Sequence, residues 1–212
     1  GHIISYAKVV DNEVKSVRFM NVPSFVQELN GVININDYQN ISYDIAFGGA
    51  FYAIVSSKEL DLECKPSNIN KIINLGMEIK DEISNKVDLF HPFDKELNFL
   101  YGTIFIDKPS SKKYHSKNVC VFANGEVDRS PTGTGVSARI AVHYARNEID
   151  IGTPITIESI IGSTFTVRVI EKTKIGQYDA VIPEVEGSAN IIGKNSFWID
   201  PQDKNGQGFI LK

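Results

Sequence analysis

The feature that most constrains the fold of this chain is a glycine-rich stretch that separates an apolar run from a helical pattern. Residues 119–123 are apolar and end at an Asn-Gly dipeptide, which predicts a strand closed by a turn. Residues 128–138 read D-R-S-P-T-G-T-G-V-S-A, and apolar residues then recur at helical spacing over 136–146. The sequence therefore predicts a strand, a turn rich in glycine and hydroxyl groups, and a helix.

A helix that begins at glycines is a potential anion site. Its first backbone N–H groups have no partner within the helix and lie at the positive end of the helix dipole, which suits a carboxylate or a phosphate. Glycine also lets a ligand approach the backbone closely. An ordinary capped helix start, with Ser130 or Thr132 as the cap and no ligand, fits the same spacing. The local pattern leaves both interpretations open.

Composition narrows the possible partners. The chain has 212 residues, is 42% hydrophobic and carries a net charge of −4, without a basic stripe. Nucleic acid and membrane are therefore not expected as partners, and small-molecule chemistry is favoured. The two cysteines, Cys64 and Cys120, have no metal-like or redox spacing, which indicates a reducing, cytoplasmic compartment. The four histidines show no metal-ligand pattern either, so we expect no metal.

Around the glycine-rich stretch, the chain alternates short strand-like runs with one further helical pattern. Residues 3–10 and 14–19 predict a hairpin, and residues 43–55 predict two strands with a bend at the Gly-Gly pair between them. Residues 70–87 have the apolar spacing of an amphipathic helix. Further strands are predicted at 99–106, 155–158, 164–170, 178–183 and, with turns, 187–198. This pattern is typical of an α+β fold in which strands cover each helix.

One alternative concerns the glycines themselves, because residues 133–138 fit the G-x-G-x-x-A dinucleotide fingerprint. In a Rossmann unit the first glycine follows the strand almost directly, whereas residues 124–132 intervene in this chain. The downstream strands also read as an antiparallel meander. Absorbance from a bound nicotinamide or flavin would support this alternative.

A second interpretation rests on a family resemblance. Residues 128–138 closely resemble the second catalytic motif of the proline racemase family, which reads D-R-S-P-C-G-T-G-T-S-A. Other stretches resemble that family in the same order, so the resemblance covers essentially the whole chain. These stretches are residues 21–25, 44–53 and 159–165, followed by Pro183, Gly187 and Gly208-Phe209.

The resemblance implies a cofactor-independent enzyme with the diaminopimelate-epimerase-like fold, an α+β fold in which each of two pseudo-symmetric halves wraps a helix in mostly antiparallel strands. This chain would contain one complete half and part of the other. Residues 1–40 would end the first half, residues 41–186 would form the second domain, and residues 187–212 would return to the first half as C-terminal strands. A homodimer is one assembly that the resemblance allows.

The same resemblance implies roles for individual residues. Thr132 stands at the position of the second catalytic cysteine. The amides of Gly133 and Thr134 would hold the carboxylate of a proline or hydroxyproline substrate, Asp128 would pair with its ring ammonium, and Phe122 would pack on the ring. From residue chemistry alone, Phe122 also fits a core residue and Asp128 a turn or capping residue.

Thr132 decides which reaction we expect. A threonine hydroxyl has far too high a pKa to replace a thiol as general base or acid, so racemisation is not expected. If a cysteine on the other face removes the α-proton, the carbanion can expel a β-hydroxyl. A cysteine/threonine pair resembles the trans-3-hydroxy-L-proline dehydratases, which make Δ1-pyrroline-2-carboxylate. The alternatives are a proline racemase or 4-hydroxyproline 2-epimerase, and a non-catalytic module that binds an amino-acid carboxylate.

The family's first motif, a Met-Cys-Gly-His-Gly-like run that carries the first catalytic cysteine, occurs nowhere in the 212 residues. From this we expect an N-terminally truncated chain that is inactive by itself. A mass spectrum and an activity assay of these residues test that expectation.

Overall fold

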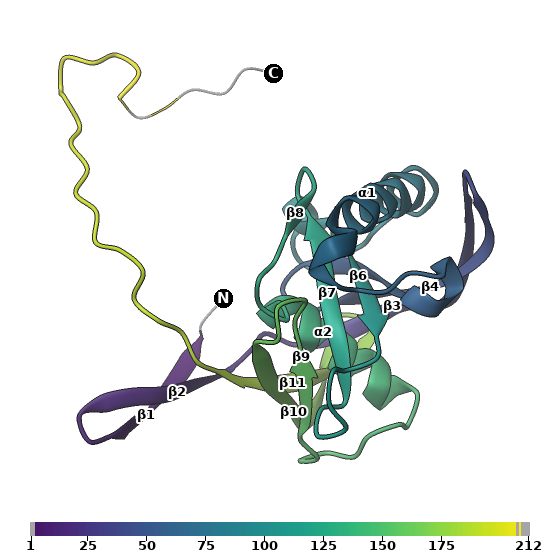
Figure 1. Cartoon of the computed structure of the whole chain (residues 1–212), viewed down its shortest axis with the longest axis horizontal. Coiled ribbons are helices and arrows are strands. Elements are labelled where there is room, and N and C mark those ends of the chain that lie inside the picture. The colour runs from purple at the N-terminus through teal and green to yellow at the C-terminus, as the bar shows by residue number, and fades with distance from the viewer. Residues whose placement is uncertain (1–2, 207, 209–212) are drawn as a thin grey trace.

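The strands form a single sheet that closes on itself around a helix (Figure 1). The computed structural model describes residues 3–206 and 208. Within this part of the chain the strand order is β1-β2-β11-β10-β9-β7-β6-β5-β4-β3, with β8 paired to β7. The pairs β5–β6 and β7–β9 are parallel and the other pairs are antiparallel. The strands are β1 Ile4–Val10, β2 Glu13–Met20, β3 Ser24–Ile35, β4 Tyr38–Phe47, β5 Phe51–Ser56, β6 Leu100–Asp107, β7 Ser116–Phe122, β8 Glu126–Val127, β9 Ile155–Glu158, β10 Thr164–Ile175 and β11 Tyr178–Gly187.

The ring closes where β3 meets β11. Phe25 pairs with Ala180 and Ser24 pairs with Val181, and β3 then leaves β11 and pairs with β4. The strands from β11 through β10, β9, β7, β6, β5 and β4 to β3 therefore surround a central space. This closure depends on residues more than 150 positions apart in the sequence.

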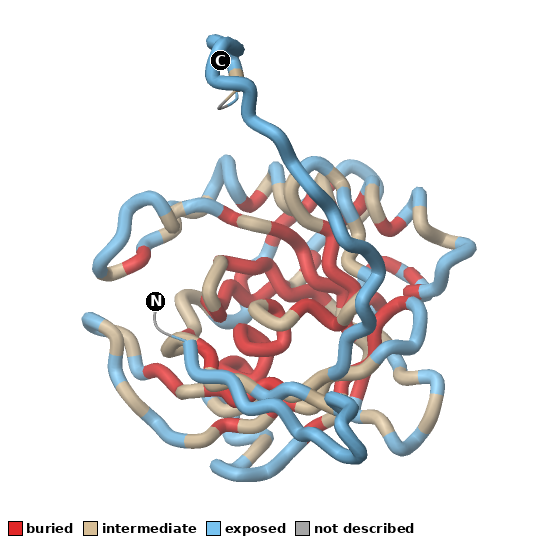
Figure 2. Tube along the Cα trace, turned by 90° about the vertical axis from the view of Figure 1, so that its left-hand side faces the viewer, coloured by how far each residue is buried: buried red, intermediate tan, exposed pale blue. Residues whose placement is uncertain are grey.

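Helix α2, Gly133–Ala145, fills the ring. Residues 135–142 are all buried, and Figure 2 shows the buried residues gathered at the centre of the molecule. Val136 and Ile140 pack against β9, β10 and β11, while Ala138 and Val142 pack against β4 to β7. The sequence pattern predicted one apolar helix face from residue 136. The helix instead begins at Gly133, and its residues 135–142 are buried on all sides because strands surround them.

Helix α1, Ile69–Lys86, lies outside the ring against β6 and β7 (Figure 1). Its buried side chains recur at helical spacing, which confirms the predicted amphipathic helix. A Cβ atom on Gly76 would lie 2.7 Å from the Cβ of Val121, so a glycine is needed for α1 to approach β7 this closely. Three short 3₁₀ helices connect the elements: η1 Ser57–Leu60, η2 Pro66–Asn68 and η3 Lys95–Leu97.

Strand β7 separates the two helices. Val119 and Val121 belong to the apolar cluster beneath α1, whereas Cys120 belongs to the cluster around α2. Asn118 likewise faces α2, where it accepts a hydrogen bond from Arg139. This alternation follows from the pleat of a strand, in which successive side chains point to opposite faces.

The strands predicted over 187–198 are wrong beyond Gly187, where β11 ends. Residues 188–206 contain no strand, and Ile191 and Trp198 are 98% and 95% exposed. A strand forms only against a partner strand, and this segment pairs with none of the described strands. Residues 207 and 209–212, which complete the predicted C-terminal strands, lie outside the described residues. The division of the chain at 40 and 187 stays a prediction.

Across residues 3–206 and 208, neither helix combines the length and the apolar character that crossing a membrane requires.

Candidate active site

The turn before α2 is organised by the carboxylate of Asp128. Its Oδ1 accepts the Ser130 N–H at 2.8 Å, and its Oδ2 accepts the Thr132 hydroxyl at 3.0 Å. The N–H of Thr132 in turn donates to Oγ of Ser130 at 3.0 Å. Asp128 therefore acts as the turn residue that its chemistry suggested. This role uses two of about four lone-pair positions on the carboxylate, so it leaves acceptor capacity for a ligand.

Thr132 occupies the N-cap position of α2, but its side chain does not cap the helix. The hydroxyl is directed back to Asp128, and the carbonyl accepts the Val136 N–H at 2.8 Å. The backbone has φ 68° and ψ 103°, a region that a β-branched residue rarely adopts and that costs about 1–3 kcal/mol. Thr132 is only 6% exposed. The structure therefore holds this residue in one strained orientation at the helix start.

The first amides of α2, those of Gly133 and Thr134, come directly after this turn. A helix cannot satisfy its own first N–H groups, so both are available to an anion at the positive end of the dipole. The hydroxyl of Thr134 lies 2.6 Å from that of the buried Tyr52, which fixes the threonine side chain. Residues predicted to bind a carboxylate thus lie together with Asp128 and Thr132.

The Gly-Gly bend predicted between β4 and β5 packs against the same helix start. A Cβ atom on Gly48 would lie 2.2 Å from the Thr134 carbonyl oxygen, so only glycine allows this approach. Nδ2 of the buried Asn21 donates to the Gly48 carbonyl and to Oγ of Ser137, both at 2.8 Å. The bend and the end of β2 therefore brace the first turn of α2.

Aromatic side chains lie beside the start of α2. Phe122, at the end of β7, stacks on Tyr101 with ring centroids 5.5 Å apart. Tyr101, Phe99 and Tyr52 line a pocket of about 310 Å³ that also contacts Thr134. Phe122 does not line this pocket but contacts Tyr101, which does.

Neither cysteine has the environment of a general base. Cys120 lies on β7 beneath the turn, and burial, with a further contribution from Asp128, raises its pKa to about 12. Burial likewise raises the pKa of Cys64 to about 12. Both thiols remain protonated near neutral pH. Among the described residues, no three histidine, cysteine or acidic side chains come close enough to form a metal site.

Two supporting residues were not predicted from the sequence. Nδ2 of Asn118 donates to the Pro131 carbonyl at 2.7 Å, and Oγ of Ser163 donates to the Arg129 carbonyl at 2.9 Å. Each fixes one carbonyl group of the turn. An asparagine directly before the apolar run 119–123 was the available signal for the first, since a buried amide needs a partner.

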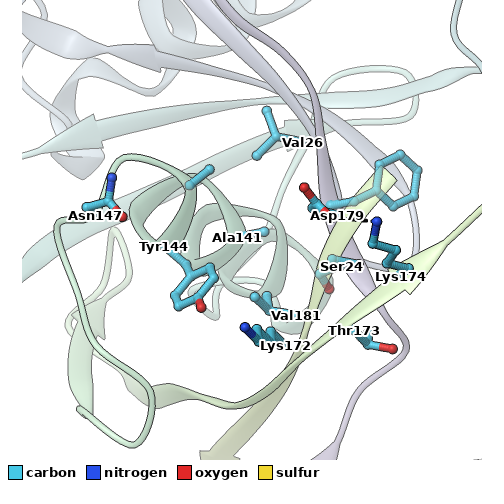
Figure 3. Close-up of a pocket in the computed structure, with 13 residues that line it drawn as sticks. Ser24, Val26, Ala141, Tyr144, Asn147, Lys172, Thr173, Lys174, Asp179 and Val181 are labelled. Atoms are coloured by element: carbon cyan, nitrogen blue, oxygen red, sulfur yellow. Dashed lines mark ion pairs between the residues drawn. The ribbon is translucent and has the colours of Figure 1, made fainter. Parts of the chain in front are cut away.

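A second pocket lies at the other end of α2 (Figure 3). It has a volume of about 650 Å³, with Ala141 and Val181 in its wall and Lys172 among the charged residues that line it. None of the residues predicted to form the site lines this pocket. The residues predicted to form the site therefore lie beside the amino end of α2, away from this pocket.

Comparisons with known proteins identify relatives of this chain. The sequence model of the proline racemase family matches residues 1–210. A trans-3-hydroxy-L-proline dehydratase of Colwellia psychrerythraea is 45% identical over 212 residues, covering 100% of this chain and 60% of that protein. A proline racemase of Clostridioides difficile is 38% identical over 204 residues, covering 96% of this chain and 61% of that protein.

The fold also matches a solved structure. A hydroxyproline epimerase from Agrobacterium vitis, with bound trans-4-OH-L-proline, superposes with a TM-score of 0.89 at 33% identity, covering 99% of this chain and 60% of that one. This match confirms the α+β fold that the resemblance implied. The chain spans about 60% of the length of these relatives.

Proposed function

Because the chain belongs to the proline racemase family, we propose that the protein that contains it dehydrates trans-3-hydroxy-L-proline to Δ1-pyrroline-2-carboxylate. We call that protein the whole protein below. The observation that carries the proposal is Thr132. A hydroxyl bound to Asp128 stands at the helix start where the racemase motif has a thiol. The dehydratase from Colwellia, at 45% identity, supports the same reaction.

The stereochemistry of the substrate explains why a threonine suffices. In trans-3-hydroxy-L-proline the α-hydrogen and the 3-hydroxyl both lie opposite the carboxylate, and so on the same face of the ring. A base on that face takes the α-proton, the C–H electron pair forms the C2=C3 bond, and the hydroxyl leaves with a proton as water. Transfer of a proton from nitrogen to C3 then gives the imine. The opposite face needs no acid or base, whereas racemisation requires one there.

The base is proposed to be a cysteine outside these residues. Cys64 and Cys120 are both buried, with the pKa raised to about 12, so neither can take the α-proton near neutral pH. Relatives are longer than this chain, which covers 60% of the Colwellia protein. We further propose that the site forms between α2 and a second half of the fold, following the division at residues 40 and 187.

The geometry of the turn supports the remaining roles that we propose. The free amides of Gly133 and Thr134 are proposed to bind the carboxylate, which the helix dipole favours. Asp128, with lone pairs to spare, is proposed to bind the ring ammonium. Phe122 is proposed to face the ring carbons together with Tyr101, on which it stacks.

We also propose a location and an assembly state for the whole protein. Two free, buried thiols suit a reducing compartment, so we propose a cytoplasmic location. Association into a homodimer stays a prediction, for which sedimentation of the whole protein is the measurement.

A proline racemase or 4-hydroxyproline 2-epimerase is the second candidate, because relatives with these names share the fold. It would need Thr132 to exchange a proton with the α-carbon. The non-catalytic carboxylate-binding module is the third candidate. Calorimetry of this chain with pyrrole-2-carboxylate, a planar mimic of the deprotonated substrate, measures whether its helix start binds a carboxylate.

One assay separates the first two candidates. The whole protein is incubated in D₂O with L-proline and, separately, with trans-3-hydroxy-L-proline, and both are followed by NMR. The proposal expects conversion of the hydroxyproline to the imine and, by chiral chromatography, no D-proline from L-proline. Rapid racemisation of L-proline without loss of water from the hydroxyproline would contradict it.

A further inference from the structure

A buried arginine lies in the middle of α2 without a carboxylate beside it. Arg139 is 1% exposed, and its guanidinium donates to neutral groups on β7, Oδ1 of Asn118 at 3.3 Å and Oγ of Ser116 at 2.9 Å. Its Nη2 also lies 3.2 Å from Nε2 of His143. Among the described residues, none forms an ion pair with Arg139. A buried cation of this kind costs stability that an apolar side chain would not.

The contacts on the far side of His143 show how the charge is accommodated. Because a guanidinium only donates, Nε2 of His143 must be the acceptor, and its Nδ1 then donates to Oε2 of Glu148 at 2.5 Å. Burial next to Arg139 lowers the pKa of His143 to about 4, which keeps the imidazole neutral. The negative charge of Glu148 thus offsets the positive charge of Arg139, with the neutral imidazole of His143 between them. This arrangement stabilises the arginine but does not explain why the core contains it.

The explanation lies at Asn118, which is fully buried between Arg139 and the turn of the candidate site. Its Oδ1 accepts from Arg139, while its Nδ2 donates to the Pro131 carbonyl at 2.7 Å. An amide that flipped would point its oxygen at this carbonyl and its N–H groups at the guanidinium, and both contacts would be repulsive. Arg139 therefore fixes which end of Asn118 faces the turn.

The group that Asn118 binds is the peptide bond directly before Thr132. Its carbonyl, that of Pro131, is held by Asn118, and its N–H, that of Thr132, is held by Oγ of Ser130 at 3.0 Å. Both ends of this peptide plane are thereby fixed. The next backbone angle is the strained φ of 68° at Thr132, so the plane sets the direction of the hydroxyl and of the Gly133 amide.

We propose that Arg139 is a positioning residue that, through Asn118, fixes the Pro131–Thr132 peptide and thereby orients the Thr132 hydroxyl and the first amides of α2. Arg139 itself does not touch the ligand. The effect on turnover rests on the proposed function, but the effect on the turn does not.

The decisive variant is Asn118→Asp. It keeps an oxygen toward Arg139 and even gives the guanidinium a carboxylate, but it removes the donor to the Pro131 carbonyl. Arg139→Met is the second variant, because it removes the charge while keeping an apolar core. Ser116→Ala is the matched control, since it removes another partner of Arg139 on β7 that has no contact with the turn.

Amide hydrogen exchange of the whole protein is the first measurement. We expect both Asn118→Asp and Arg139→Met to accelerate exchange at Thr132 and Val136 by at least about tenfold, with little change at Arg146 at the other end of α2. Ser116→Ala should leave Thr132 and Val136 unchanged. Unchanged exchange in the first two variants, or an equal rise at Arg146, would overturn the proposal.

Turnover is the second measurement, and it separates this proposal from the proposed function. If the whole protein dehydrates hydroxyproline, kcat should fall by about tenfold or more in Asn118→Asp, and Ser116→Ala should keep the original value. If the whole protein shows no such activity, the proposed function fails while the exchange experiment still decides the role of Arg139. Faster exchange at Thr132 with an unchanged kcat would overturn the orienting role.

Discussion

The hydroxyl of Thr132 donates its hydrogen to Oδ2 of Asp128 across 3.0 Å. The proton of this hydroxyl is therefore engaged by the carboxylate, and the threonine has no second ionisable hydrogen to exchange with a ligand. A thiol in the same place would be an acid of ordinary strength at the positive end of a helix. A threonine and a cysteine at position 132 thus differ in whether this face of the site can transfer protons.

Replacing Thr132 by cysteine should add proton exchange to the whole protein. We expect Thr132→Cys to raise the rate at which L-proline is converted to D-proline by at least about 100-fold, the usual contribution of a general acid or base. Thr132→Ser is the matched control, because it keeps a hydroxyl. Equal racemisation rates in the two variants would show that residue 132 does not set the reaction.

Asp128→Asn should weaken binding of a ligand that has a ring ammonium more than binding of a ligand that lacks one. The amide keeps the acceptor for the Ser130 N–H but removes the negative charge. Affinity for trans-3-hydroxy-L-proline should fall by about 1.5–3 kcal/mol, the strength of a hydrogen bond to a charged group. Pyrrole-2-carboxylate lacks the ammonium, so its affinity should fall by only about 1 kcal/mol. Calorimetry of the whole protein measures both, and equal losses would exclude Asp128 as the ammonium partner.

Gly48→Ala should destabilise the fold, because the added Cβ would lie 2.2 Å from the Thr134 carbonyl oxygen and 2.4 Å from the Ala138 nitrogen. Both neighbours are backbone atoms of α2, so relief requires the bend to move away. We expect a loss of at least about 2 kcal/mol in urea unfolding. Gly133→Ala is the control at the same helix start, since its Cβ would meet only Phe19 at an ordinary 3.5 Å. Similar stabilities for the two variants would contradict the close packing of the bend.

The stability of the fold should fall as the pH drops from about 6.5 to about 4, in part through His143. Burial and the neighbouring Arg139 lower its pKa from 6.5 to about 4, with His115 also disfavouring its charge and Glu148 favouring it. Between these values the unfolded chain binds a proton that the folded chain does not. Protonation of the unfolded state therefore costs the fold up to about 1.4 kcal/mol per pH unit.

The matching experiment is urea unfolding from pH 7 to pH 4.5 for the original chain and for His143→Gln. Other groups titrate in this range, so the difference between the two chains isolates His143. We expect the variant to lose less stability as the pH falls. Parallel curves would show that the buried ring does not carry this dependence.

Much of the local structure followed from short-range patterns. The strand before Asp128, the glycine-rich turn and the amphipathic α1 were predictable because periodicity and turn chemistry act over a few residues. The burial of residues 135–142 of α2 on all sides was not predictable in this way. It depends on the closure of the ring at Phe25 and Ala180, a contact between distant parts of the chain.

The candidate site shows the same division. Asp128, Thr132 and Gly133 stand within six residues of one another in the sequence, and the structure keeps them together at the turn before α2. Arg139 and Asn118 did not stand out, since a charged residue on a helix is most often exposed. The strands predicted over 187–198 are absent beyond Gly187, because an apolar pattern forms a strand only when a partner strand is present.

The alternation of side chains on β7 makes this strand intolerant of insertions and deletions. A slip of one residue would turn Asn118 toward the apolar cluster beneath α1 and would place Val119 against the guanidinium of Arg139. The side-chain amide of Asn118 and the guanidinium of Arg139 would then each be buried without this hydrogen-bond partner, and both groups would cost free energy in the same slipped state. Pairing of β7 one residue out of register is therefore unfavourable on both faces of the sheet at once, which favours the native register during folding.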